Sequence, residues 1–139
     1  MLWSKEGTLM AAVWGPVIRG LPQTSAAAEH SAIMALTEIL ADQLVQPNET
    51  AKVHTDYAGA VKAWAQPMAA AAADKAYGGL YRVAASRVKP SLVDISWVKG
   101  HALEKMKDLE GEELWKAQGN DQADKYAAKG REIHEMMRR

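Results

Sequence analysis

The sequence predicts an α/β domain, because short strand-like runs alternate along the chain with segments of helical periodicity. Two of these runs, 51–55 and 91–100, carry the β-branched residues that are typical of strands. A length of 139 residues suits one domain with its own hydrophobic core and is short for two. Since no repeat or linker-like segment interrupts the sequence, we expect a single domain over residues 1–139.

The composition is that of a soluble globular protein, with 48% hydrophobic and 24% charged residues. Seventeen basic and 17 acidic residues cancel, so any nucleic acid must be bound through local geometry rather than bulk charge. The absence of cysteine excludes disulfides and thiolate metal sites. No apolar run approaches the roughly 20 residues of a transmembrane helix, and "MLWSKEGT" lacks a signal-peptide pattern. We therefore expect an intracellular protein without a membrane partner, in a compartment that the sequence does not indicate.

The first expected elements are a strand and a helix. Residues 8–18 form an apolar run that ends in the structure-breaking "RGLPQT", which predicts a buried strand. Thr24 or Ser25 can cap a helix over residues 26–44, and Pro47-Asn48 stops it. Apolar residues recur through this helix at the spacing of one face, namely Ile33, Leu36, Leu40 and Leu44.

The middle of the chain repeats this alternation. Residues 51–55 predict a short strand that ends at Asp56, and a helix that carries Val61 and Trp64 follows. Pro67 interrupts this helix. We expect Trp64 in the core, because it lies on the apolar face of its helix.

An alanine-rich stretch at 69–73 leads into a segment that we expect to be helical up to Pro90. Gly78-Gly79 weakens the middle of this helix, and Tyr81 lies on its apolar face. The dense apolar and β-branched residues of 91–100 then predict a largely buried strand.

The charged residues 102–119 form either a loop or a short amphipathic helix. We expect an inserted, solvated segment whose apolar side chains dock on the body of the domain. These side chains are Leu103, Met106, Leu109 and Trp115. Asn120 is a good N-cap for a last helix that begins at Asp121.

Four residues that could carry chemistry fall at the ends of the expected elements, namely Glu29, Asp56, His101 and Asp124. Carboxylates at strand ends and helix starts can converge on one edge of a sheet, where a hard cation such as Mg²⁺ binds oxygen ligands. Each residue also has an ordinary structural explanation. Asp124 can complement a helix dipole, Asp56 can cap the next helix, and His101 can be structural or solvated.

The order and context of these residues resemble the ribonuclease H family. The strand end "WVKGHA" at 97–102 matches the family letter for letter, and "GNDQADKYA" at 119–127 matches its "G-N-x-x-A-D-x-x-A" helix start. "VHTDYAGAV" resembles the family's "TDS" strand end, and Glu29 follows Thr24 as the family's helix-borne glutamate follows a threonine-containing turn. The resemblance runs from about residue 9 to 130, with "LWSKEGTL" similar to the hairpin that precedes the third strand.

This resemblance implies a ribonuclease H-like mixed sheet flanked by helices and an endonuclease that cuts the RNA strand of an RNA–DNA hybrid. Glu29, Asp56 and Asp124 would hold two Mg²⁺ ions, with Mn²⁺ as an alternative ion, in a two-metal hydrolysis. His101 would assist proton transfer or product release. The resemblance also implies substrate contacts from three further residues, namely Thr24, Ser25 and Asn120.

One catalytic carboxylate of the family has no counterpart here. The family's first strand carries an Asp in a "D-G-S" segment, and no such segment occurs in the sequence. We therefore expect an N-terminally truncated version of the fold. The sequence leaves three explanations open: a fragment of a longer product, a second chain or swapped copy that supplies the strand, or a non-cleaving relative. The alternative function is accordingly a non-catalytic nucleic-acid-binding or assembly domain.

Overall fold

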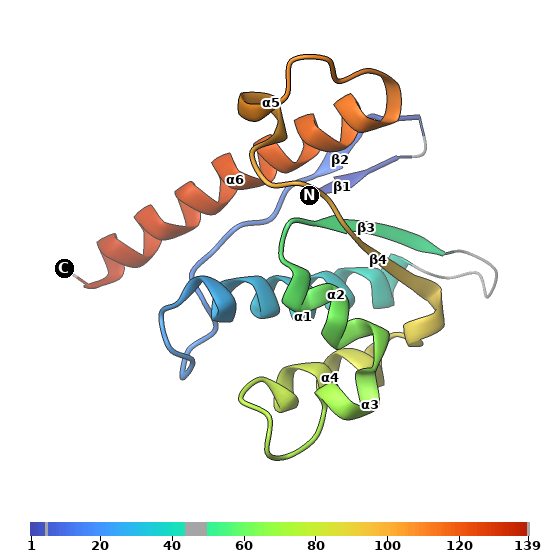
Figure 1. The fold of residues 1–139 in the computed structure, drawn as a ribbon. Helices are drawn as coiled ribbons and strands as arrows, with labels where there is room; N and C mark the ends of the chain where they lie inside the picture. The colour runs from blue at the N-terminus through green and yellow to red at the C-terminus, as the bar shows by residue number, and fades with distance from the viewer. Residues whose placement is uncertain (5, 44–49, 139) are drawn as a thin grey trace. The chain divides into compact units, whose positions relative to one another are not determined.

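The computed structural model describes residues 1–4, 6–43 and 50–138. Figure 1 shows a mixed α/β chain with six α-helices, a parallel strand pair and an antiparallel hairpin among these residues, so the predicted α/β class is confirmed. The chain forms two compact units. One comprises Val17–Val98, and the other combines Met1–Pro16 with Lys99–Arg139.

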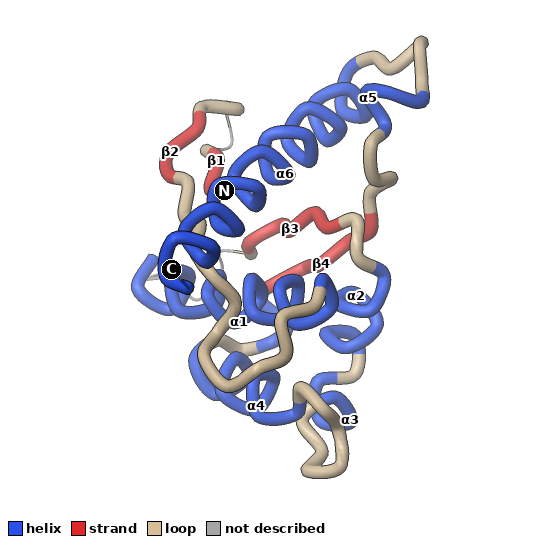
Figure 2. Tube along the Cα trace, turned by 90° about the vertical axis from the view of Figure 1, so that its left-hand side faces the viewer, coloured by secondary structure: helices blue, strands red, loops and turns tan. Residues whose placement is uncertain are grey.

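The Val17–Val98 unit is built on a parallel pair of strands. Strand β3 (Ala51–Thr55) pairs with β4 (Val93–Trp97), with Val53 opposite Ile95. The two are joined through helices α2 (Ala58–Ala65), α3 (Pro67–Ala70) and α4 (Gly78–Arg87) and the 3₁₀ turn η1 (Pro90–Leu92). Helix α1 (Ser25–Gln43) precedes β3. Figures 1 and 2 show α1 and α2 on one face of the strand pair.

The core of this unit lies between that face and the helices. Its buried residues come from all these elements, namely Ile33, Leu40, Ala60, Trp64, Tyr81, Ala84, Val88, Val93 and Ile95. The Trp64 indole Nε1 donates a hydrogen bond to the Val93 carbonyl at 3.0 Å, which fixes α2 on β4. The predicted core positions of Trp64 and Tyr81 are confirmed.

The strand predicted at 91–100 is shorter and less buried than expected. Its first residues form the 3₁₀ turn, and the strand ends at Trp97, which is 56% exposed. Residues alternate across a strand, so Val93 and Ile95 face the core while Asp94 is exposed. Because the helices of this unit cover one face, β4 is buried on one side and the prediction of a largely buried strand is wrong.

Helix α1 confirms the helix predicted here and settles its cap. The Thr24 hydroxyl accepts a hydrogen bond from the Ala27 N–H at 3.1 Å, so Thr24 rather than Ser25 is the capping residue. Leu44 and the predicted stop at Pro47-Asn48 lie outside the described residues.

The alanine-rich segment is not one helix up to Pro90. Helix α3 ends at Ala70, and α4 begins only at Gly78, so Gly78-Gly79 opens a helix rather than weakening its middle. A Cβ built on Gly78 would lie 2.3 Å from the Ala72 carbonyl oxygen. The turn therefore packs too closely on the helix start for a side chain, which alanine propensity does not reveal.

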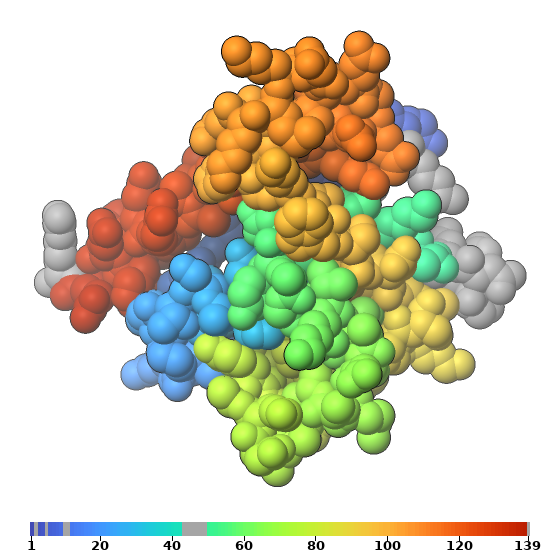
Figure 3. Space-filling view, in the orientation of Figure 1, coloured from blue at the N-terminus to red at the C-terminus, as the bar shows by residue number. Residues whose placement is uncertain are grey.

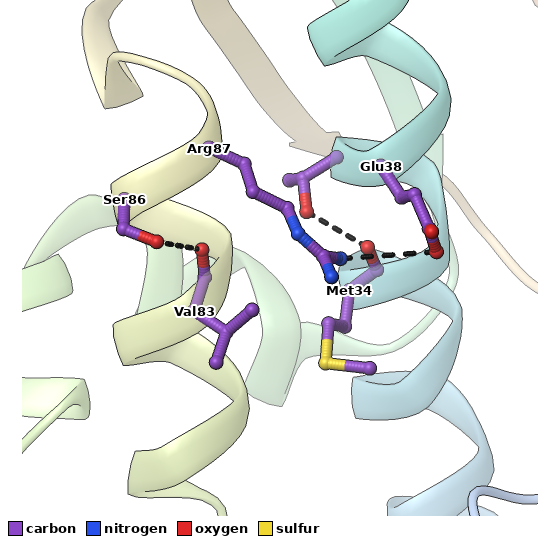
Figure 4. A network of polar contacts seen from close by, with 6 residues as sticks. Met34, Glu38, Val83, Ser86 and Arg87 are labelled. Carbon is purple, nitrogen blue, oxygen red and sulfur yellow. Dashed lines mark hydrogen bonds and ion pairs between the residues drawn. The ribbon is translucent and has the colours of Figure 1, made fainter.

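Helices α1 and α4 pack side by side through apolar residues, with polar contacts at their edge (Figure 4). Arg87 forms an ion pair with Glu38 at 3.8 Å, and the buried Thr37 hydroxyl donates to the Met34 carbonyl at 2.8 Å. The Ser86 hydroxyl likewise donates to Val83 within α4, at 2.7 Å. The ion pair is largely exposed, so we expect it to contribute little to stability.

The second unit begins with a hairpin of β1 (Leu2–Trp3) and β2 (Leu9–Ala11). The expected hairpin is confirmed: its turn is closed by a bond from the Gly7 N–H to the Ser4 carbonyl, and Gly7 has a φ of 84°.

The strand predicted over 8–18 is wrong beyond Ala11. Val13 is 62% exposed and Trp14 43% exposed. The segment is held by helix α6 (Gly111–Arg138) instead of by strand pairing. The Trp14 ring lies 4.9 Å from that of Tyr126, and a Cβ on Gly130 would come within 2.6 Å of the Gly15 carbonyl oxygen.

Helix α6 begins nine residues before the predicted N-cap, so Asn120 lies inside a helix and caps nothing. Acidic residues in the first turn and pairs at i,i+4 explain the early start. These pairs are Glu112–Lys116 at 3.1 Å and Asp121–Lys125 at 2.9 Å. The region 102–119 therefore comprises the short helix α5 (Ala102–Lys105), a connection and the first part of α6.

Across residues 1–4, 6–43 and 50–138, no helix has the length and apolar character needed to cross a bilayer.

We expect Ser31→Ala to raise the free energy of unfolding by about 1 kcal/mol more than Ser86→Ala. The Ser31 hydroxyl is buried in α1 without a hydrogen-bond partner among the described residues, whereas the Ser86 hydroxyl is exposed and bonded. Both substitutions add an alanine to a helix, so helix propensity cancels. Urea denaturation of the two variants measures the difference, and equal values would contradict the burial of an unsatisfied Ser31 hydroxyl.

Candidate active site

Asp56 is positioned by the end of β3. The Thr55 hydroxyl accepts a hydrogen bond from the Tyr57 N–H at 3.1 Å, and the Trp97 indole donates to the Asp56 carbonyl at 3.2 Å. The N-cap of α2 is Tyr57. Asp56 therefore directly precedes the cap position of the next helix rather than occupying it.

A buried cluster of rings brings the start of α1 next to the end of β3. The His30 ring packs edge to face on Tyr57, with centroids 5.3 Å apart. Glu29 directly precedes His30 and Asp56 directly precedes Tyr57, so the contact draws the two backbone segments together. Both carboxylates are partly buried, and both residues already interact with other described residues.

The sequence did not single out His30, the residue at the centre of this ring cluster. Its Nδ1 and the Tyr81 hydroxyl are 2.5 Å apart, and its ring stacks on Tyr77 with centroids 4.4 Å apart. Burial lowers the pKa of His30, since a charged imidazole would lose its hydration. Burial, and then the charge of Tyr57, raise the pKa of Tyr81 above its ordinary value. A histidine in a helix turn beside several tyrosines in the sequence gives no direct signal of this cluster.

The other unit brings His101 and Asp124 together. The His101 Nδ1 lies 3.9 Å from Asp124 Oδ2 and 3.8 Å from Glu104 Oε1. His101 has a φ of 55°, a left-handed conformation that only a few per cent of non-glycine residues adopt. Glu104 was not expected here, although its i,i+3 spacing from His101 is visible in the sequence.

Asp124 does not serve the dipole of a helix start. It lies well inside α6, whose first turn holds Glu112 and Glu113. The dipole effect falls off within the first turn, so that explanation is wrong for Asp124 and for Asp121. The Asp124 carboxylate instead faces a histidine.

The three expected substrate contacts occupy different environments. Thr24 is exposed and its hydroxyl is engaged as the cap of α1, while Ser25 is an exposed first residue of that helix. Asn120 is partly buried within α6 and has an interaction partner.

Two pairs thus emerge, each within its own unit: Glu29 with Asp56, linked through their neighbours, and His101 with Asp124. Within the part of the chain that the structure describes, no cluster of three or more His, Cys, Asp or Glu side chains could hold a metal ion. The donors themselves are hard carboxylate oxygens, the ligand type that Mg²⁺ takes. No protein-family model, curated protein or solved structure matches the chain.

We expect the free energy of unfolding to fall as the pH falls below about 6.5, the ordinary pKa of histidine. Because the folded state lowers the pKa of His30, the unfolded state binds the proton more readily, and this part of the stability is present only above that pH. His30→Phe keeps a planar ring and removes the titrating group. Denaturation of both proteins between pH 5 and 8 tests the idea, and an unchanged pH dependence in the variant would contradict it.

The left-handed backbone at His101 predicts that His101→Asn changes the free energy of unfolding by less than about 0.5 kcal/mol. His101→Val should lower it by about 1 kcal/mol or more, since a β-branched residue is strained in this conformation. Thermal denaturation of the two variants distinguishes the backbone requirement from a loss of the imidazole. Equal destabilisation by Asn and Val would rule out the conformational cause.

Proposed function

We propose that the chain is a ribonuclease H-like, Mg²⁺-dependent endonuclease domain that binds an RNA–DNA hybrid and hydrolyses its RNA strand. The observation that carries the proposal is the pairing of His101, held in a left-handed conformation, with Asp124. These are the two functional residues of the "WVKGHA" and "GNDQADKYA" motifs, on which the family resemblance chiefly rests. The contact between the neighbours of Glu29 and Asp56 adds support from the other unit.

In this proposal Glu29, Asp56 and Asp124 are the metal ligands. Bound Mg²⁺ would neutralise the charge that develops on the phosphodiester oxygens. Asp124, whose Oδ2 lies 3.9 Å from the His101 Nδ1, would also orient the His101 ring. The His101 side chain is more than half exposed, so it can exchange a proton with water or with a leaving oxygen.

Substrate would be held by Thr24, Ser25 and Asn120. Hydroxyl and amide groups donate to phosphate and 2′-hydroxyl oxygens, which is how proteins recognise A-form-like duplexes by shape. Within this proposal the mixed sheet of the family is completed by its first strand with the missing carboxylate, supplied by a longer product that contains this sequence, by a second chain or by a swapped copy. The parallel pair β3–β4 is the part of that sheet among the described residues of the Val17–Val98 unit.

A second candidate function is nucleic-acid binding or assembly without cleavage. It is favoured by the lack of a "D-G-S" segment in the sequence, since that segment carries the family's fourth carboxylate. The two candidates differ in one respect that an assay can measure: both bind the hybrid, and one cuts it.

The test is cleavage of an end-labelled RNA–DNA hybrid in Mg²⁺ and in Mn²⁺. We expect Asp56→Asn to reduce cleavage at least about 100-fold, because it removes a ligand charge at the reacting phosphate. Asp94→Asn is the matched control. Asp94 is an exposed carboxylate on the neighbouring strand β4, and its substitution should leave the rate within about twofold.

Three outcomes decide between the candidates. Cleavage that Asp56→Asn abolishes and Asp94→Asn preserves supports the endonuclease. Binding of the hybrid by gel shift, without cleavage in either metal even when the missing first strand is restored, supports the non-catalytic domain. Absence of both binding and cleavage in a folded protein, as judged by circular dichroism, rejects the two together.

A further inference from the structure

A hollow in the unit formed by Met1–Pro16 and Lys99–Arg139 takes no part in the site described above. It has a volume of about 430 Å³, within the range of roughly 300–1,000 Å³ that small-molecule sites occupy. The hairpin β1–β2 lines one side and helix α6 the other, and Figure 3 shows the surface of α5 and the first part of α6 in orange.

The hollow gathers apolar side chains that the fold leaves exposed. Trp115 is 40% exposed, Leu9 39% and Leu103 38%, and Trp3 completes the apolar lining. A neighbouring hollow of about 350 Å³ shares Trp115. Leu103 and Trp115, two of the side chains expected to dock, are thus partly covered and present the rest of their surface to the hollow.

Polar groups are placed along one edge of this apolar surface. Trp115, Gln118, Gly119 and Gln122 recur at i, i+3, i+4 and i+7, so they share one face of α6. The side-chain amides of Gln118 and Gln122 offer donors and acceptors beside the Trp115 indole. Asp121 also lines the hollow, and since its Oδ2 bonds Lys125 at 2.9 Å, its other oxygen remains able to accept.

Two glycines of α6 differ in whether packing explains them. Gly130 is explained by packing, because a Cβ there would collide with the Gly15 carbonyl. Gly119 is not: a Cβ there would meet no atom within 4 Å. A glycine inside a helix is unfavourable relative to alanine, and here its effect is to leave the floor of the hollow open.

The residues that line the hollow favour one chemical class of ligand over others. An organic cation would need unpaired carboxylates beside the rings, but Glu112 and Asp121 already pair with Lys116 and Lys125. A saturated apolar chain would give the side-chain amides of Gln118 and Gln122 no hydrogen-bond partner. A neutral, planar heterocycle with an exocyclic amine satisfies both parts of the lining, since its face stacks on indole and its edge bonds amide and carboxylate groups.

We propose that this hollow binds an unpaired adenine base of a nucleic-acid strand, stacked on Trp115 and hydrogen-bonded by Gln118, Gln122 and Asp121. Glutamine pairs with the N6 and N7 edge of adenine through two hydrogen bonds, and base–aromatic stacking is the usual way in which single strands are held. The assignment of the base to a strand, rather than to a free nucleotide, rests on the proposed function.

The experiment measures tryptophan fluorescence quenching by single-stranded oligoadenylate, oligouridylate and adenosine monophosphate. Oligoadenylate should bind at least about fivefold more tightly than oligouridylate. Adenosine monophosphate should bind more weakly than the oligonucleotide, because the strand adds phosphate contacts elsewhere. Tighter binding of the free nucleotide would overturn the strand as the source, and equal binding of all three probes would overturn adenine recognition.

Gly119→Leu is the decisive variant, because a Cβ at this position meets no atom within 4 Å, so the leucine side chain extends into the hollow, and leucine is a better helix former than glycine. It should weaken oligoadenylate binding at least about tenfold. Gly79→Leu in α4 is the matched control, since Gly79 is also a helical glycine whose Cβ would meet no atom within 4 Å. Binding that survives Gly119→Leu would place the base elsewhere, and Gln118→Leu with Gln122→Leu should equalise adenylate and uridylate.

Failure of this inference is distinguishable from failure of the proposed function. Asp94→Asn should bind oligoadenylate as tightly as the unaltered protein, because Asp94 neither lines the hollow nor belongs to the proposed metal site. A protein that cleaves the hybrid and shows no adenylate-dependent quenching rejects the hollow alone. One that binds adenylate and neither binds nor cleaves the hybrid rejects the proposed function alone.

Discussion

The buried His30–Tyr81 hydrogen bond and the tyrosines around it are the contact on which the proposed carboxylate pair depends. His30 comes from α1, Tyr81 from α4, and Tyr57 from the end of β3, so one imidazole joins three elements of the Val17–Val98 unit. A buried polar pair of this kind stabilises only while both partners remain bonded. Through its ring contact with Tyr57, His30 thus joins the helix turn that carries Glu29 to the strand end that carries Asp56.

The sequence predicted best the elements whose signals are local. Strand β3 and helix α1 begin where turn residues and a threonine cap place them, and the Asp56 strand end follows from the same pattern. The two motifs singled out His101 and Asp124, which lie 3.9 Å apart, but Asp124 lies inside α6 rather than at a helix start, and the motifs gave no reason to expect Glu104 beside them. Local patterns thus located the candidate residues and said little about their partners.

The remaining elements were mispredicted because tertiary contacts decided them. Residues 12–18 were predicted as part of a strand, yet the Trp14 ring packs at a tilt on Tyr126, and Lys129 lies over both rings at 5.3 and 4.7 Å. Asn120 was predicted to begin a helix, but ion pairs at i,i+4 on both sides of Asn120 stabilise a helix that continues through this residue. The position of Gly78 depends on a turn carbonyl several residues away. None of these partners can be read from a local window.

Two residues that break local conformational preferences lie in the regions for which we propose a function. His101 adopts a backbone conformation that favours glycine, and Gly119 occupies a helix interior that favours alanine. A sequence that specifies its fold tends to break such rules only where function offsets the cost. Packing accounts for Gly130 and Gly78, whereas no packing contact accounts for Gly119. Gly79 is equally free of packing contacts and does not line this hollow, so the support for binding beside Trp115 comes from the residues that line the hollow rather than from the glycine alone.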